Sequence, residues 1–152
     1  MKAVLQRVCS ASVEVENKLI SKIDNGILIL LGIHKEDTAE DINLLVDKIC
    51  KLRIFEDEDR KLNLSLSDAK GDIMLVSNFT LLADCKKGSR PSFSDAMTFK
   101  NSESLYNEFA SLLSERLDCK VEKGIFGADM QVSLVNDGPV TIVLDTKELR
   151  CK

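Results

Sequence analysis

The chain has 152 residues, of which 44% are apolar and 30% are charged, and its net charge is −4. This length and composition predict one soluble globular domain that covers residues 1–152. The acidic balance argues against a protein that coats long nucleic acid, although a small local patch is enough to bind an RNA end. The longest purely apolar run, Ile27 to Leu31, is far too short to cross a membrane, so no membrane partner is expected.

Cysteine and histidine usage argues against a metal site and against a cofactor. The five cysteines lie at positions 9, 50, 85, 119 and 151, and no two of them have C-x-x-C spacing. Reduced thiols in a cytoplasmic protein are therefore the better interpretation. The single histidine, His34, has no second histidine to share a metal, and a Ser-His-Asp triad could draw on no other residue.

The N-terminal third of the chain predicts β-structure. Apolar residues alternate over residues 4–8 and 11–15, and a third strand is predicted at residues 19–23. Asp24-Asn25-Gly26 predicts a hairpin turn, because Asn and Gly both tolerate positive φ. The nearly continuous apolar run at residues 27–33 predicts a strand that is buried on both faces.

A change of period then predicts the first helix. Thr38 and Asp41 form a capping box at the start of an amphipathic helix over about residues 38–52. The charged run at residues 56–61 predicts a solvated loop. An apolar central strand is predicted at residues 73–76.

A polar cluster, Ser77-Asn78-Phe79-Thr80, follows this central strand. Two hydroxyls, an amide and a flat aromatic face at the end of a buried strand suit the mouth of a pocket, although such residues can also simply end a strand. The next segment, residues 83–93, predicts a loop with three cations, Lys86, Lys87 and Arg90. These cations fit either a solvated surface or contacts with phosphates.

The C-terminal part predicts a second helix and two more strands. Asn101 or Ser102 could cap a helix whose apolar positions extend to Leu117. Alternation predicts strands at residues 130–135 and 140–144, with a strand break at Gly138-Pro139. That dipeptide is read either as a hairpin turn or as a cis peptide bond that forms a rigid rim of carbonyls.

These elements together predict an α+β single domain. Seven or more strands and two main amphipathic helices favour curved, barrel-like, antiparallel-rich sheets. No GxGxxG loop, linker or low-complexity segment interrupts the chain.

At the polar cluster and at Asn136-Asp137-Gly138-Pro139-Val140-Thr141, the sequence resembles the D-aminoacyl-tRNA deacylases, formerly called D-tyrosyl-tRNA deacylases. The likeness covers the whole chain and includes the segments 87–93 and 124–130. The family hydrolyses the ester that joins a D-amino acid to the 3′-terminal ribose of tRNA, which makes it a carboxylic ester hydrolase. The resemblance therefore implies tRNA as a partner, with mischarged glycyl-tRNA as a second substrate.

The resemblance also implies a homodimer in which Gly138-Pro139, joined by a cis bond, reaches into the active site of the second chain. There its carbonyls receive the α-amino group and leave no room for an L side chain, which is selection by exclusion. Arg7 matches a residue that steadies this segment. Phe126 and Met130 match residues that border the terminal adenosine.

The resemblance leaves two roles for Thr80, as a nucleophile or as part of a wall that positions the ester and its oxyanion. A nucleophilic hydroxyl needs a general base, and the sequence offers no credible one. We therefore favour Ser77, Asn78 and Thr80 as the positioning wall, with Phe79 as its support. The family's usual tetrapeptide has Gln where this chain has Asn78, which keeps the amide on a shorter side chain.

Two alternatives belong to other classes of protein. One is an RNA-end-binding module without chemistry, and the other is a threonine hydrolase of small esters or thioesters. A deacylation assay separates the first from the enzyme, and activity on an ester without RNA would indicate the second.

Overall fold

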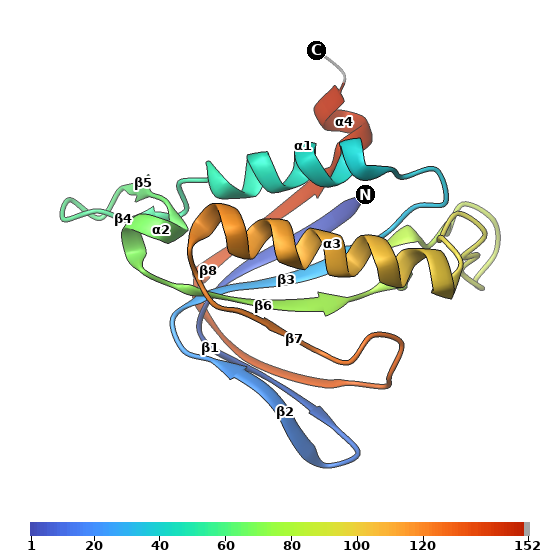
Figure 1. Ribbon diagram of the computed structural model, residues 1–152, viewed down its shortest axis with the longest axis horizontal. Helices are drawn as coiled ribbons and strands as arrows, with labels where there is room; N and C mark the ends of the chain where they lie inside the picture. The colour runs from blue at the N-terminus through green and yellow to red at the C-terminus, as the bar shows by residue number, and fades with distance from the viewer. Residues whose placement is uncertain (151–152) are drawn as a thin grey trace.

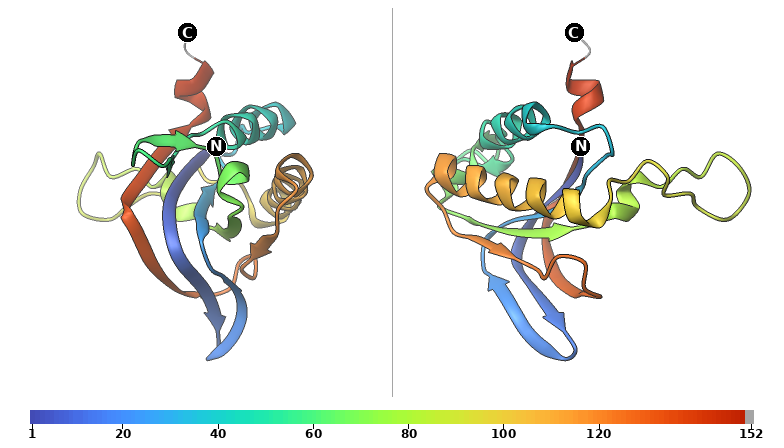
Figure 2. Two further views of the ribbon diagram at one scale, coloured as in Figure 1. Left: turned by 90° about the vertical axis from the view of Figure 1, so that its left-hand side faces the viewer. Right: turned by 45° about the vertical axis from the view of Figure 1, so that its right-hand side comes forward.

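A strongly curved β-sheet carries two long helices, α1 (Ala39–Cys50) and α3 (Phe99–Leu117), on one of its faces (Figure 1). The computed structural model describes residues 1–150. The predicted α+β class with a barrel-like sheet is confirmed (Figure 2). Cys151 and Lys152 lie outside the described residues.

The long strand β1 (Lys2–Val15) is the centre of the sheet and pairs with three others: β2 (Lys18–Ile23), β3 (Gly26–Gly32) and β8 (Gln131–Asp145). β2 and β3 share one register along β1, because Ala11 lies opposite Ile23 and Val8 lies opposite Gly26. The chain reverses at Glu16 and Asn17, which both have positive φ. Because β1 is continuous from Lys2 to Val15, the two strands predicted at residues 4–8 and 11–15 are one strand.

The hairpin turn predicted at Asp24-Asn25-Gly26 is wrong, since β3 continues the direction of β2 along β1. Gly26 instead allows the neighbouring strand β6 (Asp72–Ser77) to approach closely. A Cβ atom on Gly26 would lie 2.0 Å from the Asp72 carbonyl oxygen. The glycine thus serves backbone packing between parallel strands.

The two long helices are the crossover connections of a parallel part of the sheet. β6 pairs in parallel with β3 and with β7 (Val121–Lys123), and parallel neighbours need such crossovers. Shorter elements complete the chain: β4 (Phe55–Glu56), β5 (Leu62–Leu64), α2 (Leu66–Ala69), the 3₁₀ helix η1 (Phe79–Leu82) and α4 (Thr146–Arg150).

Both predicted helices are present, but one begins earlier than predicted. Thr38 and Asp41 form the predicted capping box, and the Thr38 N–H donates to the Asp41 carboxylate at 3.0 Å. The second helix begins at Phe99, so the caps predicted at Asn101 or Ser102 are wrong. Within its first turn, the Ser102 hydroxyl donates back to the Thr98 carbonyl at 2.9 Å.

Buried side chains form two cores, one on each face of the sheet. The larger core lies between the sheet and the helices, and its largest fully buried members include Leu5, Ile29, Leu45 and Phe109. The smaller core lies within the curve of the opposite face: Val8, Ala11, Val13, Ile23, Leu28, Met74 and Val76. β6 contributes to both cores and is therefore fixed from both sides.

Strand β8 runs through Gly138 and Pro139 without reversing, so the hairpin reading of this dipeptide is wrong. Gln6 lies opposite Thr141, and Val8 lies opposite Asn136. The four residues 137–140 consequently form a bulge that has no register partner on β1. Pro139 lacks an N–H, and it is tolerated because no ladder hydrogen bond is required of it there.

The Tyr106→Phe substitution should lower the free energy of unfolding by about 1 kcal/mol. The buried Tyr106 hydroxyl donates to the Leu75 carbonyl in β6 at 2.8 Å, and that carbonyl keeps a second donor, the Gly124 N–H at 3.1 Å. Urea unfolding followed by far-ultraviolet circular dichroism measures the change. A loss below about 0.3 kcal/mol would show that this hydrogen bond does not stabilise the fold.

Candidate functional site

A pocket of about 310 Å³ opens at the end of β6, beside the start of α3. Five of the residues predicted for the site line it together: Ser77, Asn78, Phe79, Phe126 and Met130. They come from segments far apart in the sequence, because β6 and the connection from β7 to β8 meet at this end of the sheet. The pocket wall also includes Leu31, Ile33, Ala96, Met97 and Phe99, so most of its lining is apolar.

Backbone hydrogen bonds fix the polar wall of this pocket. The Asn78 N–H donates to the Leu31 carbonyl at 2.8 Å, which extends the pairing of β3 with β6 by one residue. Asn78 then caps η1, and its side chain accepts from the backbone of that helix. The polar wall is thus held by two elements whose positions are set by the core.

Asn78 binds both donors of Thr80. Its Oδ1 accepts the Thr80 N–H at 3.2 Å and the Thr80 hydroxyl at 2.5 Å. Thr80 is exposed and lies outside the pocket lining, so it meets the predicted site only through Asn78. In this arrangement the hydroxyl is a donor to an amide oxygen, which is not a base that could activate it.

Phe99 and Phe126 form the aromatic side of the pocket, with Tyr106 behind Phe126. The Phe126 ring lies 5.1 Å from that of Phe99 and 5.2 Å from that of Tyr106, measured between ring centroids. Gly127 has a φ of +74°, and a Cβ atom there would lie 2.0 Å from the Phe99 ring. The glycine therefore lets the turn pass over this ring and keeps Phe126 at the pocket.

A second pocket, of about 350 Å³, lies on the other side of the same polar wall. Ser77, Asn78, Asp129 and Met130 line both pockets, and Gln6 reaches only the second. Sequence reasoning missed Asp129, which is the single titratable side chain among the described residues that line either of these two pockets. The sequence signal that could have pointed to Asp129 is its position in the glycine-rich turn between β7 and β8.

Arg7, Gly138 and Pro139 lie together, away from both pocket linings. The buried Arg7 guanidinium donates to the Asp137 carbonyl at 3.2 Å and to the Ile54 carbonyl at 2.8 Å, and it pairs with the Asp137 carboxylate at 3.0 Å. Gly138 and Pro139 are exposed, and the peptide bond between them is cis. Arg7 thus ties the bulge of β8 to the body of the protein.

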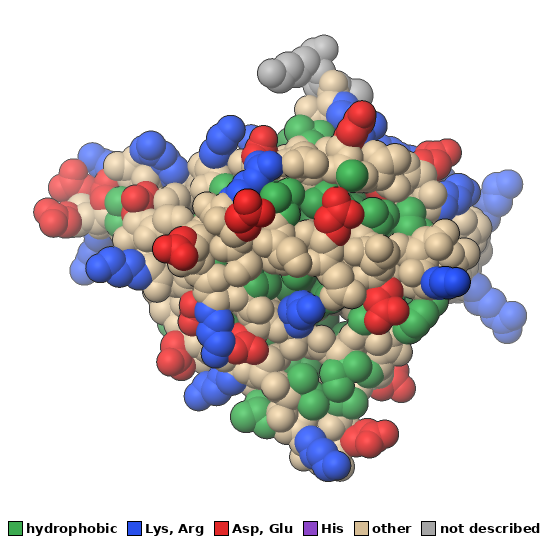
Figure 3. Space-filling model, viewed as in Figure 1, with side chains coloured by type: hydrophobic (Ala, Val, Ile, Leu, Met, Phe, Trp, Pro, Cys, Tyr) green, Lys and Arg blue, Asp and Glu red, His purple; other side chains and the backbone are tan. Residues whose placement is uncertain are grey.

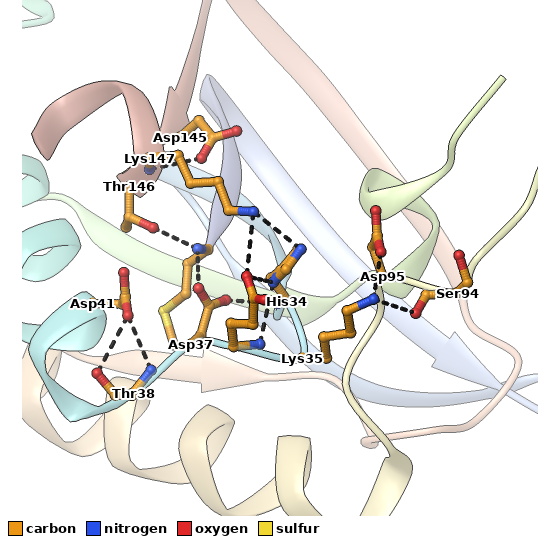
Figure 4. Close-up of polar contacts among 12 residues, drawn as sticks. His34, Lys35, Asp37, Thr38, Asp41, Ser94, Asp95, Asp145, Thr146 and Lys147 are labelled. Carbon is orange, nitrogen blue, oxygen red and sulfur yellow. Dashed lines mark hydrogen bonds and ion pairs between the residues drawn. The ribbon is translucent and has the colours of Figure 1, made fainter. Parts of the chain in front are cut away.

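His34 lies in a different cluster, shown in Figure 4. Its Nε2 atom is 3.2 Å from the Lys147 Nζ, and its backbone N–H donates to Asp37. Asp37 also accepts a 2.6 Å hydrogen bond from the ammonium group of Met1. This cluster lines a third pocket, of about 220 Å³, which none of the predicted site residues reaches. None of the hydrogen bonds of His34 reaches Ser77 or Thr80, so the structure does not present it as their base.

A surface ion pair holds the segment that closes the first pocket. Lys35 Nζ lies 2.8 Å from the Asp95 carboxylate (Figure 4), and the Met97 N–H donates to the Ile33 carbonyl at 2.9 Å. The hydrogen bond and charge of Asp95 raise the pKa of Lys35, and those of Lys35 lower the pKa of Asp95. The ion pair is exposed, so the backbone hydrogen bond of Met97 contributes more to the position of the wall that contains Ala96 and Met97.

Two further observations concern ions and membranes. Within residues 1–150, no three His, Cys, Asp or Glu side chains gather in a way that could hold a metal ion. In the same part of the chain, no helix has the length and apolar character needed to cross a membrane.

Fold and site together define a small α+β protein whose open pocket combines hydroxyl, amide and aromatic groups. The family model described as D-Tyr-tRNA(Tyr) deacylase matches residues 4–145. The chain therefore belongs to the D-Tyr-tRNA(Tyr) deacylase family.

Relatives and solved structures agree with this membership. The chain is 54% identical to a D-aminoacyl-tRNA deacylase of Thermosipho africanus, over 98% of this chain and 99% of that one. It is 53% identical to one from Dictyoglomus turgidum, over 99% and 96%. A solved structure described as c-Myc DNA Unwinding Element Binding Protein superposes with a TM-score of 0.89 at 46% identity, covering 95% of this chain and 98% of that one. A probable eukaryotic D-amino acid tRNA deacylase, at 17% identity and a TM-score of 0.82 over 94% and 97%, shares the fold.

The Arg7→Lys substitution should lower the free energy of unfolding by about 2 kcal/mol and speed amide exchange in residues 136–140. A lysine keeps the charge but cannot contact Ile54 and both polar groups of Asp137 at once. Hydrogen exchange with mass spectrometry and urea unfolding measure the two effects. The exposed Arg53, which bonds to Asn63 at 3.1 Å, gives the matched control Arg53→Lys, expected to change stability by less than about 0.5 kcal/mol. Equal effects of the two substitutions would contradict the role of Arg7.

Proposed function

We propose that this protein hydrolyses the ester bond of D-aminoacyl-tRNA and releases free tRNA and a D-amino acid. Its membership of the deacylase family supports the reaction. The observation that carries the proposal is the meeting of Ser77, Asn78 and Phe79 with Phe126 and Met130 around one pocket. A tRNA substrate suits a cytoplasmic protein, and this location is part of the proposal.

The proposed ligand of the aromatic side of the pocket is the terminal adenosine of the tRNA. An unpaired base can stack on an aromatic ring, and Phe126 is held at the pocket by Phe99 and Tyr106. Met130 provides a polarisable apolar contact on the same wall. With the base bound there, the ester at the 3′-terminal ribose would lie near the polar wall of Ser77 and Asn78.

The proposed mechanism uses positioned donors, with no covalent intermediate on Thr80. The Thr80 hydroxyl and N–H converge on one oxygen, the Oδ1 of Asn78. An ester oxygen that accepts the Thr80 N–H would replace Oδ1 on that donor alone, while the Thr80 hydroxyl stays bonded to Asn78. The N–H would then stabilise the developing oxyanion. Water would be the nucleophile, helped by the 2′-hydroxyl of the tRNA.

In this mechanism Asn78 positions Thr80, a role that suits a side chain one methylene shorter than the family's usual Gln. Its amide reaches Thr80 two residues ahead in the chain and closes a local turn over the N-terminus of η1. The Asn78 N–H is already bonded to Leu31, so it would not serve as an oxyanion donor. We therefore assign Asn78 to the positioning of Thr80, and Phe79 to the support of the pocket wall.

Rejection of L-amino acids is proposed to require a second copy of the chain. Gly138 and Pro139 project from the β8 bulge and line neither pocket of their own chain. In a homodimer, their carbonyls would receive the α-amino group of the substrate held by the other copy and would exclude an L side chain. Glycine has no side chain to exclude, so glycyl-tRNA would also be hydrolysed.

Deacylation of D-tyrosyl-tRNA and L-tyrosyl-tRNA, measured side by side at one enzyme concentration, tests the proposal. We expect rapid loss of the D ester while the L ester is spared. The Pro139→Ala variant should reduce this preference at least tenfold, and urea unfolding of the variant checks that it remains folded. An equal loss of activity toward both esters would argue against a role of Pro139 in selection.

If the wild-type protein hydrolyses neither ester but binds deacylated tRNA, the protein is an RNA-end-binding module. Activity on a small ester that lacks RNA would instead indicate a general hydrolase. The pocket supplies the reason to test both alternatives, since it could bind an adenosine without any chemistry.

The Thr80→Val substitution distinguishes the two roles of Thr80. Valine keeps the backbone N–H and the shape but removes the hydroxyl, so kcat should stay within about tenfold of wild type. A loss of all measurable activity would establish the hydroxyl as the nucleophile. As a second measurement, a tRNA that ends in 2′-deoxyadenosine should be hydrolysed slowly by both proteins, whereas a threonine nucleophile would tolerate it.

A further inference from the structure

A cationic loop, residues 84–92, projects from the body of the protein beside the proposed site (Figure 2). Its ends are joined by two backbone hydrogen bonds between Asp84 and Ser92, of 2.8 and 2.9 Å. Every residue from 84 to 92 is exposed, and nothing lies within 4 Å of a Cβ atom built on Gly88. The loop is thus closed at its base, and its tip is free on all sides.

The loop carries three cations and one carboxylate, which gives it a net charge of +2 in a chain whose net charge is −4. The carboxylate, Asp84, accepts the backbone N–H of Lys86 at 2.9 Å and so shapes the turn. Within residues 1–150, none of Lys86, Lys87 and Arg90 forms an ion pair with a carboxylate. Their charges are therefore available to an anionic ligand.

An aromatic contact connects the loop to the pocket. Phe93, directly after the loop, packs edge-on against Phe79, with the ring centroids 5.1 Å apart. Phe79 lines the pocket, and Thr80 precedes the loop by four residues. The Phe79–Phe93 contact consequently places the base of the loop beside the polar wall, whereas Asp84 and Lys86 line the neighbouring pocket that contains His34.

The cationic loop adds positive charge to one end of the molecule. Lys and Arg side chains project at the right-hand end of the view in Figure 3, where Figure 1 draws the loop. The β4–β5 connection at the other end, residues 57–61, contains three carboxylates and two cations, so its net charge is −1. Of these two projecting segments, the loop with its net charge of +2 is therefore the one that attracts a polyanion.

We propose that the cationic loop binds the phosphodiesters of the single-stranded 3′ end of tRNA, next to the terminal adenosine. This inference rests on the proposed function and names the surface that holds the rest of the substrate. A single strand that leaves the pocket past Phe79 would bring successive phosphates to Lys86, Lys87 and Arg90. These contacts carry no sequence information, so they would hold any tRNA in the same position.

The test is a triple variant, Lys86→Gln, Lys87→Gln and Arg90→Gln, assayed with D-tyrosyl-tRNA at several salt concentrations. We expect KM to rise about tenfold with kcat unchanged, because the loop does not touch the ester. The slope of log KM against log salt should fall by about 2, since each phosphate of a single strand contributes about 0.7. D-tyrosyl-adenosine, which lacks these phosphates, should be hydrolysed equally by the variant and the wild type.

A matched control removes the same charge at the other end of the molecule, with Lys48→Gln, Lys51→Gln and Lys70→Gln. These side chains are also exposed, and the control should behave as wild type. Equal KM and salt slope in the loop variant and the wild type, or equal effects of both triple variants, would overturn the inference. Binding of deacylated tRNA, measured by fluorescence anisotropy, tests the loop separately from the reaction. If the wild type hydrolyses neither ester, the proposed function fails. Weaker tRNA binding by the loop variant, with unchanged binding by the control variant, would still support the role of the loop.

Discussion

Backbone pairing of β1 along both of its edges is the constraint on which the rest of the structure depends. One edge holds β2 and β3 in a single register, and the other holds both halves of β8. β3 then positions β6, and β6 ends in the polar wall of the pocket. The position of Asn78 is therefore determined by hydrogen bonds that begin at the N-terminal strand.

The same strand also joins the two parts of the proposed site. Arg7 extends from β1 and holds the bulge that carries Gly138 and Pro139, whereas Gln6, its neighbour, lines the second pocket. Neighbouring residues of a strand point to opposite faces, so β1 supports a pocket on one face and a projecting bulge on the other. A substitution in β1 would therefore affect both the second pocket and the β8 bulge, although the two are separate within one chain.

Sequence reasoning succeeded where a local pattern decides the structure. Helical spacing and the capping box of Thr38 predicted α1, and the apolar run before Ser77 predicted the strand that ends at the pocket. It failed where tertiary contacts override local preference. Asn25-Gly26 is a strong turn signal, yet Gly26 is used for close packing against β6, and Pro139 lies within a strand because a bulge frees it from pairing. The grouping of Phe126 with Ser77 was expected from the family resemblance, whereas the glycine-rich turn alone did not show that Asp129 lines a pocket.

The bulge at residues 137–140 has a consequence for how the sheet meets other chains. Among the described strands, β8 pairs only with β1, so its outer edge offers backbone donors and acceptors over a length of 15 residues. Such an edge is a template on which a foreign strand can assemble. The bulge bends this edge near its middle, and Pro139 removes one donor from the strand. A foreign strand could then pair only with the short stretches on either side, and this protects the protein from edge-to-edge aggregation.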